Sequence, residues 1–136
     1  MDAGRNVSAG DWRGPREEVH VAVGDQDMVL LYTNWALEYI EGAVKKSVFR
    51  LLRQLSEFDL TYGDLQQVLV AGLEASRRDR RITNMVYGLD DARKLIDARG
   101  FLPVAKIAMG AVAAVFKYDQ GETKDESPPP GTGSGS

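Results

Sequence analysis

The chain has 136 residues, of which 43% are hydrophobic and 27% charged, with no cysteine and a formal net charge of −3. This composition is typical of one globular domain, and the lack of cysteine excludes disulfides and thiolate metal sites. The negative charge lies in residues 119–136, which carry four acidic residues and one lysine, so residues 1–118 are neutral overall and no general attraction to nucleic acid or anionic lipid is expected.

Composition divides the chain into three segments. Residues 1–16 are rich in glycine and charge and predict a flexible arm, residues 17–118 carry the pattern of one folded domain, and residues 119–136 predict a disordered acidic, Pro/Gly/Ser-rich tail. The N-terminal residues lack the apolar stretch of a signal peptide. The longest apolar run, residues 104–116, is shorter than the ~17–25 residues that cross a bilayer. We therefore expect an intracellular protein without a membrane segment.

The folded domain is expected to open with a β-hairpin. Alternating valines in residues 19–23 have the period of a half-buried strand. Residues 28–32 predict the second strand, and Gly24 and Asp25 supply turn chemistry between the two. Because an isolated two-stranded hairpin is only marginally stable in water, it must pack on helices or pair with another chain.

Three amphipathic helices are predicted next. Asn34 is the expected N-cap of the first helix, which ends near Gly42, and Ser47 is the expected N-cap of the second. Thr61, with Asp64 three residues later, resembles a capping box at the start of the third.

Two further helices complete the prediction. The polar residues 77–81 end the third helix, and a fourth is expected within residues 84–98, with Gly100 just after it. Pro103 is expected to open a fifth helix that runs to about Tyr118. The predicted fold is therefore mainly α with a small N-terminal β-hairpin, an α+β fold with about five helices.

Residues that could carry catalysis are few. His20 is the only histidine, and its strand position predicts a solvated side chain more readily than a general base or a metal ligand, because metal sites need several converging ligands. Asp90 and Asp91 are adjacent, so on a helix they point in different directions and do not form a dyad. No phosphate-binding glycine motif is present. We expect no enzyme activity, no cofactor and no metal.

The fifth helix is the stronger candidate for a binding element. It is apolar on nearly all sides, and a helix of this kind must be hidden all round. Either the preceding elements enclose it completely, or another chain covers part of it. The residues that this second reading assigns to a partner or to self-association are Ala105, Met109, Gly110, Ala113 and Ala114.

A cluster of arginines near the end of the third helix is the other candidate, formed by Arg77, Arg78, Arg80 and Arg81. It could contact phosphate or an acidic protein surface. Alternatively, it is a solvated loop whose first arginines complement the helix C-terminus. The neutral body and the lack of interleaved aromatic residues argue against nucleic acid as a partner.

Several short segments, in this order along the chain, match a known pattern. They are residues 19–25, 29–37, 40–41, 64–65, 70–73, 83 and 95–97, followed by a glycine before a last apolar helix. Together they resemble the tail assembly chaperones of long-tailed, siphovirus-like phages and of gene transfer agents, in which a short hairpin precedes the helices. The resemblance spans roughly residues 18–117, and Pro103 and the Tyr87-Gly88 break depart from the family pattern.

The resemblance implies a non-enzymatic phage protein. Such chaperones bind and solubilise the tape-measure protein and help to recruit tail-tube subunits. The implied location is the host cytoplasm, and the protein is not expected in the mature virion. A homo-oligomer is expected as well, formed through the hairpin edge or the fifth helix.

Two other classes of function stay open at this point. One is another small phage structural or adaptor protein of the tail or neck, and the other is a small helical DNA-binding regulator that uses the arginine cluster. The family resemblance also suggests a ribosomal frameshift near residues 128–131, whose Pro-Pro-Pro-Gly codons permit a slippery run. The alternative there is an ordinary disordered terminus.

Overall fold

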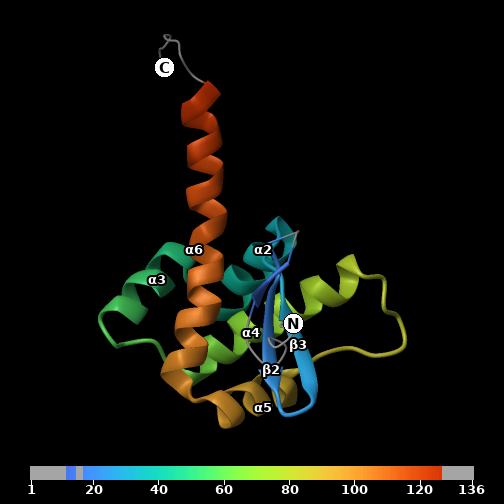
Figure 1. The fold of residues 1–136 in the computed structure, drawn as a ribbon. Helices are drawn as coiled ribbons and strands as arrows, with labels where there is room; N and C mark the ends of the chain where they lie inside the picture. Colours follow the sequence, from blue (N-terminus) through green and yellow to red (C-terminus); the bar gives the residue numbers. More distant parts are fainter. Residues whose placement is uncertain (1–11, 15–16, 127–136) are drawn as a thin grey trace.

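The computed structural model describes residues 12–14 and 17–126. In that part of the chain, a three-stranded antiparallel sheet of order β1-β2-β3 is followed by five helices (Figure 1). The α+β fold with an N-terminal hairpin and five helices is therefore confirmed. The elements are β1 (Trp12–Arg13), β2 (Val19–Val23), β3 (Gln26–Leu30), α2 (Asn34–Val44), α3 (Val48–Ser56), α4 (Tyr62–Asp79), α5 (Leu89–Arg99) and α6 (Phe101–Glu126).

The hairpin forms with its first strand and its turn where they were predicted, but the second strand, predicted at residues 28–32, is β3 at Gln26–Leu30, two residues earlier. β2 and β3 pair from Val19 opposite Leu30 to Val23 opposite Gln26, which leaves a two-residue turn. Gly24 has φ +60°, and a glycine at this first turn position is typical of a type II′ turn. The short strand β1, which pairs with the start of β2, was not predicted and lies inside the segment expected to be a flexible arm.

Local capping explains where the first three helices begin. Ser47 and Thr61 are the N-caps of α3 and α4, as predicted, and each side chain accepts a hydrogen bond from the backbone three residues later. The predicted N-cap of α2 is wrong by one residue, because the Thr33 hydroxyl accepts the hydrogen bond from the Ala36 N–H. α2 also passes Gly42 and ends at Val44.

The last helix differs more from the prediction. α5 spans Leu89–Arg99, which agrees with the helix expected within residues 84–98 apart from its last residue. α6 begins two residues before Pro103 and continues to Glu126, eight residues past the predicted end and into the segment expected to be a disordered tail. Gly100, with φ +94°, lies at the bend between the two helices. The proposed frameshift site at residues 128–131 lies outside the described residues.

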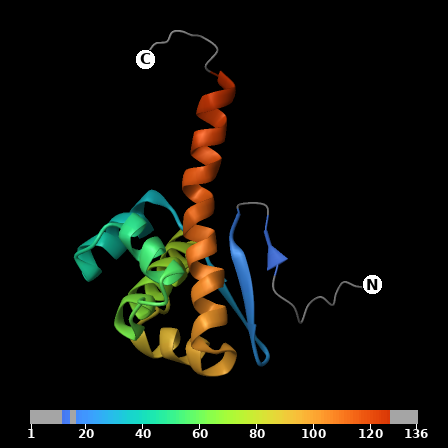
Figure 2. The ribbon, with the colours of Figure 1, turned by 90° about the vertical axis from the view of Figure 1, so that its left-hand side faces the viewer.

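The core is centred on α4, which contacts β3, α2, α5 and α6. Helices α2–α4 gather on one side of α6 and the sheet lies on the other, while the C-terminal half of α6 stands clear of the body (Figure 2). The largest fully buried side chains come from all of these layers and include Met28, Leu30, Ile40, Leu51, Leu65, Leu69, Leu73, Leu95 and Met109.

The sheet is held against α4 at one close contact. The Leu31 N–H donates a hydrogen bond to the carbonyl of Gly72 at 3.1 Å, and the Tyr32 hydroxyl donates one to the carbonyl of Val68 at 2.9 Å. A Cβ atom on Gly72 would lie only 2.7 Å from the Tyr32 ring, so this approach requires glycine. Burial raises the pKa of the Tyr32 phenol, which keeps the hydroxyl protonated as a donor.

Candidate functional site

The structure divides the candidate residues of the last helix into two groups. Ala105 and Met109 are 0% and 1% exposed and belong to the core, where the preceding elements enclose them. Gly110 is exposed, and Ala113 and Ala114 are half-buried. Only the second group is therefore accessible to another chain.

Arg77 forms contacts within the protein. Its guanidinium donates two hydrogen bonds to the Glu74 carboxylate, both at 2.9 Å, and a third to the carbonyl of Ile82 at 2.7 Å. The Glu74 carboxylate also accepts a hydrogen bond from the Tyr87 N–H at 2.5 Å. Glu74 and Arg77, which we call the loop clip, therefore hold both ends of the connection between α4 and α5, residues 80–88.

The loop clip has a defined pH dependence. Burial acts to raise the pKa of Glu74, but hydrogen bonds from Arg77 and the Tyr87 N–H, with the charges of Arg77 and Arg78, outweigh it and hold the pKa below its ordinary value of 4.5. A carboxylate with a lowered folded-state pKa stabilises the fold above the unfolded-state pKa, and this contribution is lost as the pH falls through the folded-state pKa.

We therefore expect the Glu74→Gln variant to have a lower Tm than the wild type at neutral pH, because glutamine cannot form the charged pair with Arg77. The difference in Tm should shrink as the pH falls from 4.5 through the lower folded-state pKa of Glu74, because the wild-type carboxylate becomes protonated over this range. Calorimetry of both proteins from neutral to acidic pH measures this difference. A difference that stays constant over the whole range would contradict the assignment.

The other three arginines lie at the C-terminal end of α4 and are exposed. The Arg78 guanidinium lies over the Trp35 ring, 4.5 Å from its centroid, in a cation–π contact. Arg80 donates a hydrogen bond from Nε to the carbonyl of Ser76 at 3.4 Å. Arg81 follows in the left-handed conformation, with φ +59°. The four predicted arginines are thus brought together, but Arg77 has a separate, internal role.

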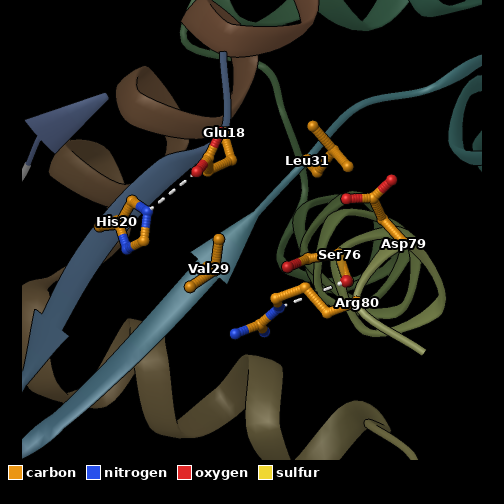
Figure 3. A pocket seen from close by; sticks show the side chains of 7 residues that line it. All are labelled: Glu18, His20, Val29, Leu31, Ser76, Asp79 and Arg80. Carbon is orange, nitrogen blue, oxygen red and sulfur yellow. Dashed lines mark hydrogen bonds and ion pairs between the residues drawn. The ribbon is translucent and has the colours of Figure 1, made fainter. Parts of the chain in front are cut away.

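A small pocket lies between the sheet and the end of α4 (Figure 3). Its volume is about 50 Å³, and its lining residues are Glu18, His20, Val29, Leu31, Ser76, Asp79 and Arg80. The His20 ring contacts Asp27 at 2.7 Å and Glu18 at 3.4 Å, and its side chain is only 13% exposed, so the predicted solvated position is wrong. A volume of this size has room for a few water molecules.

Residues 12–14 and 17–126 contain neither a metal-binding cluster nor a single membrane-spanning helix. No group of three or more His, Cys, Asp or Glu residues there could hold a metal ion. No single helix there is long and apolar enough to cross a membrane. Only α5 and residues 101–116, taken together across a bend of 118°, reach the required length and composition.

Exposed aromatic side chains that the sequence did not indicate lie on α3, at the start of α4 and in the connection between these helices, and two of them pack against rings of α6. Phe49 on α3 is 61% exposed and packs against Phe116 of α6, with ring centroids 4.7 Å apart. Tyr62, at the start of α4, is 60% exposed and packs against Phe101 at 4.5 Å. Phe58, in the connection between α3 and α4, is 80% exposed. We call these five residues the aromatic surface.

Phe58 has an unusual backbone conformation. Its φ is +57°, its N–H bonds to the carbonyl of Leu55 at 3.0 Å, and the Asp59 N–H bonds to the carbonyl of Gln54 at 2.7 Å. These are the two hydrogen bonds of a Schellman motif, in which the left-handed residue is usually glycine. A left-handed conformation costs an L-residue roughly 1–2 kcal/mol. The fold therefore holds a large, exposed ring at a position where glycine would be less strained, and such strain is concentrated at functional sites.

No protein-family model matches this chain, and no curated protein or solved structure matches it either. The features that bear on function are therefore those of its own sequence and described surface.

Proposed function

We propose that this protein is a phage tail assembly chaperone that binds and solubilises the tape-measure protein and helps to recruit tail-tube subunits. The observation that carries the binding role is the strained, 80% exposed Phe58 within the aromatic surface. Exposed aromatic rings supply large contact areas at protein interfaces and are frequent among the residues that dominate binding energy.

The choice of partner rests on the sequence resemblance. A tape-measure protein is a long helical chain, and an apolar helix needs a covering surface to remain soluble before assembly. The aromatic surface extends beside α6 from Phe101 to Phe116, residues that are 15 positions apart on one helix and so about 22 Å apart along its axis. This span equals about four turns of a partner helix, which suits the binding of a helical segment.

The experiment is co-expression of the chain with the long helical protein encoded directly downstream of its gene. We expect the long protein to be soluble and to copurify with the chain, and to aggregate when it is expressed alone. The complex should be found in infected host cells, while purified virions should lack the chain. Copurification of the chain with intact virions would favour a structural tail or neck protein instead.

A further inference from the structure

A second exposed surface lies at the far end of α4 and in the connection that follows. It consists of Arg78, Arg80, Arg81, Met85 and Val86, which we call the loop surface. All five residues are exposed, and the side chains of Met85 and Val86 are 40% and 70% exposed despite being apolar. None of the three arginines forms an ion pair with a carboxylate within the described part of the chain. Residues 78–81, with three arginines and one aspartate, carry a net charge of +2.

In the connection between α4 and α5, backbone N–H and C=O groups as well as side chains are available to a partner. No hydrogen bond within the described residues involves the backbone of residues 83–86, although the loop clip fixes the backbone on both sides of them. A segment held at both ends loses little conformational entropy when a partner binds to it. The loop surface is therefore prepared for a ligand that offers negative charge.

Arg81 has the same left-handed backbone conformation as Phe58. Its N–H bonds to the carbonyl of Arg78, and the Ile82 N–H bonds to the carbonyl of Arg77, both at 3.1 Å. With φ +59°, Arg81 occupies the glycine position of a second Schellman motif. A charged, exposed side chain is thus held in a conformation that glycine would adopt with less strain.

The chain itself contains a segment of the complementary charge. The end of α6 carries Asp119, Glu122, Asp125 and Glu126 against Lys124, a net charge of −3, and it follows the neutral body directly. Figure 1 shows that this end of α6 leads away from the body and from the connection between α4 and α5. Because α6 is one continuous helix, its acidic end does not reach the loop surface of the same molecule.

We propose that the loop surface of one molecule binds the acidic end of α6, residues 119–126, of a second copy of this chain. Each molecule uses a different surface from its partner, so the contact is head-to-tail and builds a ring or an open chain. The attraction is between opposite charges near the surface, and it weakens as salt is added. This contact is separate from the aromatic surface and does not depend on the identity of the partner bound there.

The test is the association constant of the full-length chain, measured by sedimentation equilibrium at low and high salt. We expect self-association that weakens with salt, and a loss of about tenfold or more in the Arg80→Glu/Arg81→Glu variant. A second variant, Glu122→Lys/Asp125→Lys/Glu126→Lys, should lose association similarly. An equimolar mixture of the two variants should associate again, because the reversed charges attract each other.

Two controls separate this contact from general effects of charge and folding. Arg50→Glu/Arg53→Glu changes the charge by the same amount on α3, which lies on the other side of the body from the connection in Figure 1, and should leave association unchanged. Arg81→Gly relieves the left-handed strain and should weaken association while raising Tm. A wild-type chain that is monomeric at every concentration and salt, or a mixture of variants that does not reassociate, would overturn the proposal. Neither result bears on the tape-measure protein, whose binding is measured separately.

Discussion

Replacement of Gly72 by alanine is expected to lower the free energy of unfolding by about 1–3 kcal/mol, although alanine is the better helix former. The new Cβ atom would lie 2.7 Å from the Tyr32 ring and 3.0 Å from a methyl group of Leu30. Neither neighbour can move freely, because the Tyr32 hydroxyl is bound to the Val68 carbonyl and Leu30 is fully buried. Chemical denaturation followed by circular dichroism measures the change.

A matched control is available in α2. Gly42 is also helical, but a Cβ atom there would meet nothing within 4 Å, so Gly42→Ala should raise the free energy of unfolding by about 0.5–1 kcal/mol. In a Tyr32→Ala background, the Gly72→Ala substitution should destabilise the protein less, because only the contact with Leu30 remains. If Gly72→Ala alone were as stable as the wild type, the close contact between α4 and the end of the sheet would be wrong.

The second large effect is expected along α6. Ala105→Glu should lower the free energy of unfolding by about 3–5 kcal/mol, because Ala105 is 0% exposed and the new carboxylate would be buried without a partner. Ala113→Glu places the same charge two turns later at a half-buried position, and should cost less than about 1 kcal/mol. Thermal and chemical denaturation of both variants measure the contrast. Equal losses would show that α6 is enclosed along its whole length.

The parts of the fold that were predicted correctly depend on local chemistry. Ser47 and Thr61 cap helices through hydrogen bonds that span three residues, and Gly24 forms a two-residue turn, so each is visible in a short stretch of sequence. β1 has only two residues and pairs with a strand six or more residues away, so no periodicity indicates it. The start of α5 was left open by the sequence because Gly88 interrupts the pattern, and in the structure Gly88 is the N-cap, with its N–H bound by the Asp91 carboxylate.

The candidate site was predicted only in part. Arg77 was expected at a binding surface, but it pairs with Glu74, three residues earlier on α4, and with the carbonyl of Ile82. The turn that ends α4 brings Ile82 to Arg77, a contact that residue type alone does not reveal. The exposed aromatic residues were missed because the amphipathic pattern of a helix predicts its buried residues and does not single out apolar residues beside them. Phe49 follows the buried Val48 on α3, and Phe58 lies beyond the end of that helix. A large aromatic residue outside the buried face of every predicted helix is the signal that could have found them.

Phe58 and Arg81 share a property that connects the two proposed surfaces. Each is an exposed L-residue in the left-handed position of a Schellman motif, one on the aromatic surface and one on the loop surface. Substitution by glycine at either position is expected to stabilise the fold and to remove a side chain that we propose to contact a partner. Stability and binding are therefore expected to change in opposite directions, as is common where function requires strain.

The measurement that tests the central claim most directly is the Kd for the tape-measure protein, compared between the wild type and Phe58→Gly. The account predicts that the variant has a higher Tm, since strain worth roughly 1 kcal/mol is relieved, but binds at least about tenfold more weakly. Lys45→Gly is the control, because Lys45 is also left-handed, with φ +61°, and lies outside the aromatic surface. It should raise the Tm and leave the Kd unchanged. A Phe58→Gly variant that is stable and binds as tightly as the wild type would contradict the claim.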